Sequence, residues 1–310
     1  RQDARSSSLS STAAVAFGGG TPALTSATEE WNADFAYGVW ATGGSMNTAR
    51  STLAGAGTQT AALGFGGNTG SVTGVTELYN GTAWAELNDL NTPKLQLAGK
   101  GTSTSALGFG GNNPVTATTE SWSGTSWTEV NDLNTARSQL GGSGASNTSA
   151  LAFGGNVPPA KNETELWNGS NWTEVNNLNT ARRLLGGIGT QTAALAIGGL
   201  DTAVTAITEV WNGTNWTEVN DLNNARYGLV GIGTSTSALA TGGFITAPST
   251  VNESWNGTNW ANTTSLPTAT AEGASAGTST AGLYFGGAAP SVTTTTFEWY
   301  GDGTLSENID

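Results

Sequence analysis

The residues from Leu195 to Arg226 read LAIGGLDTAVTAITEVWNGTNWTEVNDLNNAR. This stretch decides the fold because almost every position in it recurs at fixed spacing along the chain. Its Gly-Gly pair recurs with a spacing of 48 residues once and 44 residues five times, with first glycines at Gly18, Gly66, Gly110, Gly154, Gly198, Gly242 and Gly286. Such internal periodicity, in the range of roughly 20–50 residues, is typical of repeat architectures.

Three further columns follow each Gly-Gly pair. The first is an acidic column of Glu29, Glu77, Glu120, Glu165, Glu209, Glu253 and Glu298. Two residues later comes an aromatic column of Trp31, Tyr79, Trp122, Trp167, Trp211, Trp255 and Tyr300. A second tryptophan follows after five residues at Trp84, Trp127, Trp172, Trp216 and Trp260. An insertion moves it to Trp40 in the first copy, and Leu305 replaces it in the last. Eleven of the 12 tryptophans lie in these columns, and Trp299 lies one residue away.

Each copy contains the pattern of four short strands. In the copy quoted above, they are expected near residues 183–189, 194–197, 208–211 and 216–219, and Asn212-Gly213 predicts a tight hairpin turn between the last two. Four strands in about 44 residues, repeated seven times, predict an all-β, seven-bladed β-propeller that occupies residues 1–310 as one domain. The expected blades are approximately 1–48, 49–92, 93–135, 136–180, 181–224, 225–268 and 269–310.

The order of these columns resembles the kelch repeat: Gly-Gly, an aromatic residue, Trp, Leu, and then a small residue with Arg before the next strand. The resemblance covers essentially the whole chain. Two features depart from the kelch pattern, namely the short spacing between the aromatic residue and Trp and the absence of a His after the Arg. The form Trp-Asn-Gly-Thr-Asn-Trp-Thr-Glu-Val is similar to kelch-like repeats of marine phages and bacteria.

The two ends of the chain are consecutive in repeat phase. Residues 308–310 match the Val-Asn-Asp segment of other copies, and residues 1–5 match Leu-Asn-Thr-Ala-Arg. If every blade begins at its innermost strand, no strand is exchanged between the first and last blades. We therefore expect side-chain packing alone to close the ring.

Composition excludes several classes of function. Ten basic and 23 acidic residues give a net charge of −13, which disfavours nucleic acid and anionic membranes as partners. Cysteine and histidine are both absent, so disulfides, thiol nucleophiles and histidine bases are excluded, and no metal or other cofactor is expected. No apolar run is long enough for a membrane span of roughly 18 residues, so we expect no membrane insertion.

Basic residues precede the innermost strand in six copies, at Arg5, Arg50, Lys94, Arg137, Arg182 and Arg226, and Thr270 occupies this position in the seventh. Propeller topology predicts that they form a ring near the mouth of the central channel. The functional hypothesis is a ligand site for a carboxylate, a sulfate or an acidic sugar. The alternative is that each basic side chain bonds to the repeated Glu or to backbone carbonyls, as a feature copied with a repeat usually does.

The loops between the second and third strands differ most among the copies and are expected on the same face as the basic ring. We therefore predict a non-enzymatic binding or structural module, located outside the cell or on a virion, that recognises a glycan or a protein. The chain begins at Arg1 without Met, so we expect upstream sequence through which it contacts other virion or surface proteins. The alternative is a glycan-acting enzyme, sialidase- or glycosidase-like, that uses the basic face.

Overall fold

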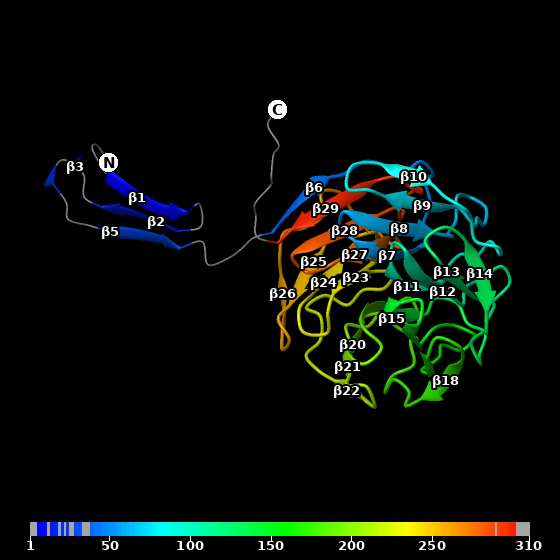
Figure 1. Cartoon of the computed structure of the whole chain (residues 1–310). Helices are drawn as coiled ribbons and strands as arrows, with labels where there is room; N and C mark the ends of the chain where they lie inside the picture. Colours follow the sequence, from blue (N-terminus) through cyan, green and yellow to red (C-terminus); the bar gives the residue numbers. More distant parts are fainter. Residues whose placement is uncertain are drawn as a thin grey trace.

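The computed structural model describes residues 5–10, 13–17, 20–21, 23–24, 28–32, 38–288 and 290–301. All the regular elements in these residues are β-strands. Six antiparallel sheets of four strands surround a central axis (Figure 1). The chain is therefore an all-β propeller, and the Asn-Gly signals correctly mark the hairpins between third and fourth strands.

Five blades are built from consecutive strands. Blade one contains β7 (Ala54–Thr58), β8 (Ala61–Phe65), β9 (Thr76–Tyr79) and β10 (Trp84–Glu86). Blade two contains β11 (Ala98–Thr102), β12 (Ser105–Phe109), β13 (Thr119–Trp122) and β14 (Trp127–Val130). Blade three contains β15 (Gly141–Ser146), β16 (Ser149–Phe153), β17 (Thr164–Trp167) and β18 (Trp172–Val175). Blade four contains β19 (Gly186–Gly189), β20 (Ala194–Ile197), β21 (Thr208–Trp211) and β22 (Trp216–Glu218). Blade five contains β23 (Val230–Gly233), β24 (Ala238–Thr241), β25 (Asn252–Trp255) and β26 (Trp260–Asn262).

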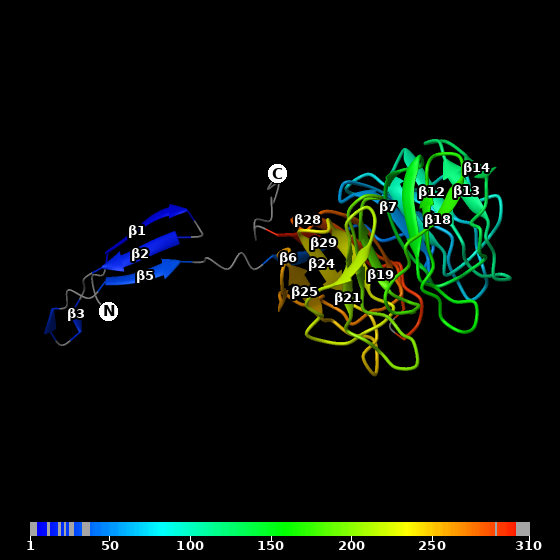
Figure 2. The same ribbon diagram turned by 90° about the horizontal axis from the view of Figure 1, so that it is seen from below.

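Blade six takes its strands from both ends of the repeat array. Its inner strands are β27 (Ala274–Gly277), β28 (Ala281–Phe285) and β29 (Thr296–Tyr300), and its outermost strand is β6 (Val39–Thr42). β6 lies beside β29 and pairs antiparallel with it (Figure 2). In this pairing Trp40 is opposite Trp299. The prediction that no strand is exchanged was therefore wrong, because the outer strand of the first copy completes the last blade.

The prediction of seven blades was also wrong, because the ring has six. The first copy contributes only β6 to the ring. Its other strands form a separate three-stranded sheet of β1 (Arg5–Ser10), β2 (Ala13–Phe17) and β5 (Thr28–Asn32), and β3 (Gly20–Thr21) pairs with β4 (Ala23–Leu24). The last copy lacks the second tryptophan of the repeat, and Trp40 fills that place. Seven sequence copies thus yield six complete sets of four strands.

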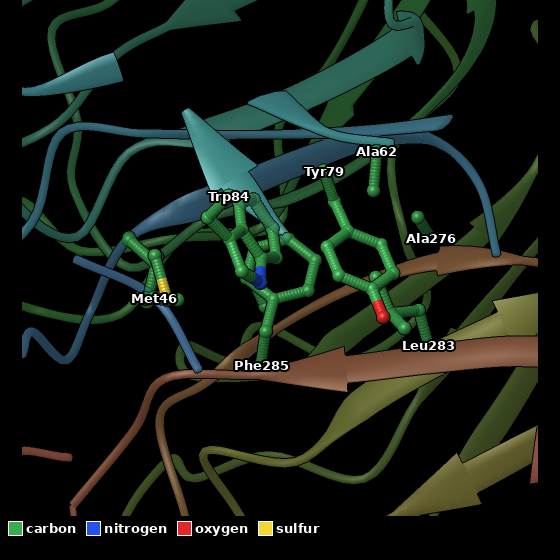
Figure 3. Close-up of a cluster of buried hydrophobic side chains, with 9 residues drawn as sticks. Met46, Ala62, Tyr79, Trp84, Ala276, Leu283 and Phe285 are labelled. Atoms are coloured by element: carbon green, nitrogen blue, oxygen red, sulfur yellow. The ribbon is translucent and has the colours of Figure 1, made fainter. Parts of the chain in front are cut away.

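The innermost strands are in contact around the whole ring, and β27 contacts β7 to close it. Aromatic side chains fill the spaces between blades. Figure 3 shows the junction of blades six and one, where Trp84 packs between Tyr79 and Phe285 with ring centroids 5.1 and 4.8 Å away. The indole N–H of Trp84 also donates to Thr296 Oγ1 of blade six at 3.0 Å. The second-column tryptophans therefore bind each blade to the preceding one through both packing and a hydrogen bond.

No helix in the described ranges is long and apolar enough to cross a membrane.

Candidate binding face and central channel

The basic residue before each innermost strand lies inside its own blade. In blade one, Arg50 Nη2 is 3.1 Å from Glu77 Oε1 and donates to the carbonyl of Gly64 at 3.2 Å. The same carboxylate accepts from the backbone N–H of Asn47 at 2.7 Å. Glu77 therefore fixes the connector that enters its blade, and Arg50 anchors that connector from inside.

This arrangement recurs in five blades, and we call it the connector clamp. Its ion pairs are Arg50–Glu77, Lys94–Glu120, Arg137–Glu165, Arg182–Glu209 and Arg226–Glu253. The basic side chains are at most 1% exposed. Burial lowers the pKa of Arg50 to about 10 although Glu77 opposes that change, and burial also lowers the pKa of Lys94. Because a broken buried pair leaves an uncompensated charge, each clamp fixes its connector strongly.

This geometry bears on the hypothesis of a basic ligand-binding ring. The hypothesis requires cationic groups that face the channel, whereas the five described side chains are enclosed in separate blades. The sixth residue, Arg5, lies in β1, and its side chain falls outside the described part of the chain. The alternative that the repeat uses its own basic residues accounts for the observed contacts. Ligand binding by these residues stays a prediction that no described contact supports.

Blade six replaces the clamp with neutral side chains. Thr270 stands in place of the basic residue, and its Oγ1 accepts a hydrogen bond from the hydroxyl of Tyr284 at 3.2 Å. Phe297 stands in place of Glu, because Phe297 pairs with Tyr284 as Glu209 pairs with Ala196. The sequence columns placed Glu298 and Tyr300 one residue out of register in this copy. Trp299, three residues after Thr296, occupies the aromatic position.

A closed ring of backbone hydrogen bonds surrounds one mouth of the channel. The residue two positions after each basic residue, and after Thr270 in blade six, donates its N–H to the carbonyl of its equivalent in the preceding blade, at 2.7–2.8 Å. All these residues have positive φ, from 53° to 62°. We call this ring the collar; it consists of Thr52, Gln96, Gln139, Leu184, Gly228 and Glu272. Because a β-branched residue rarely adopts positive φ, the conformation of Thr52 shows that the ring imposes it.

The collar opens into a cavity of about 110 Å³ at the channel mouth. Beneath the collar lies a layer of leucines, which is completed by Gly273 in blade six: Leu53, Leu97, Leu140, Leu185 and Leu229. Glu272 is the one acidic residue among those that line this cavity in the described structure. Burial raises the pKa of its carboxyl group. The mouth therefore combines a partly buried carboxyl group with two glutamines and an apolar floor.

The variable loops stand directly against the collar. The residue after each basic position forms an antiparallel bridge with the first residue of the loop in the same blade, as in Ser51–Asn68, Arg183–Leu200 and Tyr227–Phe244. The other bridges are Leu95–Asn112, Ser138–Asn156 and Ala271–Ala288. The collar and the six loops therefore form one face of the ring, which we call the loop face.

Blade five gives the loop face its most distinctive chemistry. Tyr227 and Phe244 stack with ring centroids 5.2 Å apart and an interplanar angle of 22°. Ile245 next to them is 39% exposed and is the one exposed large hydrophobic residue in the described part of the chain. Gly228 lies between the aromatic pair and Glu272 in the collar, because an added Cβ would meet Glu272 Cγ at 3.2 Å and Phe244 Cδ2 at 3.4 Å. Gly228 and Glu272 both line the mouth cavity, so the aromatic pair lies beside its rim.

Arg183, in blade four, carries a cation on the same face. Its Nη1 donates to Gln139 Oε1 at 3.2 Å, and it forms no ion pair with any described residue. Arg183 therefore differs from the adjacent Arg182, which is buried against Glu209.

Inside the channel, Lys100 is the one charged residue on the innermost strands of the six blades. It lines both a cavity of about 110 Å³ next to the leucine layer and a cavity of about 90 Å³ toward the opposite mouth. No group of acidic side chains suited to a metal ion occurs in the described residues.

Glu272, Arg183 and Lys100 were not among the residues predicted from the sequence. Two of them could have been found as departures from the repeat. Lys100 stands where other copies have Ala56, Ser143 or Ile188. Arg183 stands where other copies have Ser51 or Tyr227. The columns that drew attention were the constant ones, which hold the blades together.

Comparison with protein-family models and with curated proteins returned no match, so the resemblance to kelch repeats depends on the repeat residues alone.

Proposed function

We propose that this chain is a non-enzymatic binding module that recognises a glycan or a surface protein through its loop face, on a virion or another extracellular surface. One observation carries the proposal. The connector clamp repeats with nearly the same contacts in five blades, whereas the six loops on the same face differ from blade to blade. A rigid scaffold with variable loops at one face is a common way to build a binding surface.

The chemistry of the loop face supports a glycan or a protein as the ligand. The exposed loop tips are mostly small and uncharged, as in Thr69–Ser71 and Thr246–Ala247. Tyr227, Phe244 and Ile245 add an apolar platform, while Arg183 and Glu272 add polar groups near it. Aromatic residues with nearby polar groups are typical of recognition sites.

A glycan array with the whole chain tests this proposal, followed by calorimetric titration of any positive glycan or candidate surface protein. We expect binding that Tyr227→Ala weakens at least about tenfold. Thr258→Ala is the matched control, because Thr258 is exposed in the hairpin turn of the same blade and should leave affinity unchanged. Thermal melts of both variants verify folding. Equal weakening by both variants, or binding that Tyr227→Ala leaves intact, would contradict a site at the loop face.

Release of sugar from the same glycans tests the alternative of a glycan-acting enzyme. Glu272 is the candidate general acid for such chemistry, because its pKa is raised and it lines the mouth cavity. Glycoside hydrolysis usually requires a second carboxylate roughly 5–10 Å away. Hydrolysis that Glu272→Gln abolishes while binding persists would replace our proposal with this one.

A further inference from the structure

Lys100 lies midway along the central channel on β11, between two cavities. Residues from all six innermost strands line each cavity, so both cavities lie on the axis of the ring. The equivalent positions on the two adjacent strands hold Ala56 and Ser143, which are small. The Lys100 side chain therefore has room on both sides.

No carboxylate in the described part of the chain neutralises this ammonium group. The other two lysines face glutamates, since Lys94 Nζ is 3.2 Å from Glu120 and Lys161 Nζ is 3.8 Å from Glu163. Lys100 forms no ion pair with a described residue, and no acidic residue lines either cavity beside it. Glu272 lines only the mouth cavity, beyond the leucine layer.

An unpaired ammonium group that is partly buried in a channel is costly, and a counter-ion beside it would lower that cost. Burial alone lowers the pKa of Lys100 to about 8, so most of the side chains are still charged at pH 7. An opposite charge within about 4–6 Å would favour the charged form and raise that pKa. In a chain with a net charge of −13, an acidic polymer would be repelled from the channel, whereas a small anion screened by salt would not.

We propose that the central channel binds one small oxyanion or short carboxylate beside Lys100. The two cavities, of about 90 and 110 Å³, are several times larger than the roughly 10–15 Å³ that one water molecule requires on this measure. Their size admits an ion such as phosphate, sulfate or acetate. This site is separate from the loop face and does not depend on the proposed function.

NMR titration of lysine side chains tests the proposal, because the chain has only three lysines. The whole protein, labelled with ¹³C and ¹⁵N in lysine, is titrated with pH in a zwitterionic buffer and again with phosphate, sulfate or acetate at matched ionic strength. We expect at least one of these anions to raise the pKa of Lys100 by at least about one unit in a saturable manner. The pKa of Lys161 should not change.

Matched variants make the result specific. Lys100→Ala introduces the residue that blades one and six already carry at this position, at Ala56 and Ala276, so it should fold. In the wild-type protein, the bound anion should also shift the amide resonances of Gly101 and Gly144, which line the same cavity, in a saturable manner. Lys100→Ala should abolish these amide shifts, whereas Lys161→Ala should preserve them. Equal pKa changes at Lys100 and Lys161, or amide shifts that survive Lys100→Ala, would overturn the proposal. If Lys100→Ala does not fold, the pKa comparison in the wild-type protein decides the question alone.

Discussion

At the scale of single residues, the connector clamp shows why a basic column is constant in an acidic protein. Each clamp buries a cation and a carboxylate together and also satisfies backbone groups of the connector, as Glu209 does for Asn179 at 2.8 Å. Blade six achieves the same closure with Tyr284 and Thr270 and with no charge. The fold therefore requires a filled and hydrogen-bonded site at this position, and an ion pair is one of two solutions.

Removal of one clamp partner should be costly. Arg182→Ala leaves Glu209 buried without its cation, so we expect a loss of about 3–5 kcal/mol in the free energy of unfolding. Arg182→Lys should cost clearly less, because blade two already uses Lys94 in the same role. Urea denaturation measures both values. A loss below about 1 kcal/mol for Arg182→Ala would mean that the pair is not a structural clamp.

The stability of the protein should depend on the ionisation of Glu272, with the opposite sign to that expected for a salt-bridged carboxylate. Burial raises its pKa in the folded state above the ordinary value of 4.5. Between pH 4.5, where the carboxyl group titrates in the unfolded chain, and its higher pKa in the folded protein, the folded state binds more protons than the unfolded state. The free energy of unfolding therefore falls as the pH rises through this window. Glu272→Gln should remove this fall and make the protein more stable at pH 7. Chemical denaturation from pH 4 to 7 tests this expectation, and parallel wild-type and variant curves would contradict it.

At the scale of elements, β6 holds the ring closed. It is the fourth strand of blade six, and the indole N–H of Trp40 donates to the carbonyl of Thr264 in the connector from blade five at 3.1 Å. Trp40 also packs against Trp299 with ring centroids 5.1 Å apart. β6 thus supplies the edge of one blade and a contact with the preceding blade.

Two truncations should separate the roles of the first repeat copy. A chain that begins at residue 38 keeps β6 and should retain the cooperative unfolding transition of the propeller. A chain that begins at residue 43 leaves β29 without its outer partner and should unfold at a markedly lower urea concentration. Near-ultraviolet circular dichroism, which reports the packed tryptophans, monitors both. Equal midpoints would show that β6 is dispensable for closure.

At the scale of the whole molecule, the sequence predicted the propeller but not its blade number. The residues that recur in each copy reflect packing within and between neighbouring blades. The strands, the Asn-Gly hairpins and the tryptophan positions could therefore be predicted from them. Blade number depends on which copy each strand joins, and Trp40 has the same sequence signature whether it pairs with its own copy or with Trp299. The clue was the last copy, where Leu305 replaces Trp and the motif Thr296-Phe-Glu-Trp299 shifts by one residue. The sequence also predicted that the variable loops share one face, but it did not identify Lys100 and Glu272, because these residues belong to no repeat column.

The collar gives the closed ring a property that no single blade has. Each of its six residues donates to the preceding blade and accepts from the next, so the hydrogen bonds form a cycle without ends. Since adjacent bonds in a chain polarise one another, such a cycle should open as a unit. The amides of Thr52, Gln96, Gln139, Leu184, Gly228 and Glu272 should therefore exchange with solvent deuterium at similar, slow rates in the intact protein. The chain that begins at residue 43 loses the outer strand of blade six and its contact with blade five, yet protection should fall at all six amides. Loss of protection at Thr52 and Glu272 alone, measured by amide exchange with NMR detection, would show that the collar bonds act independently.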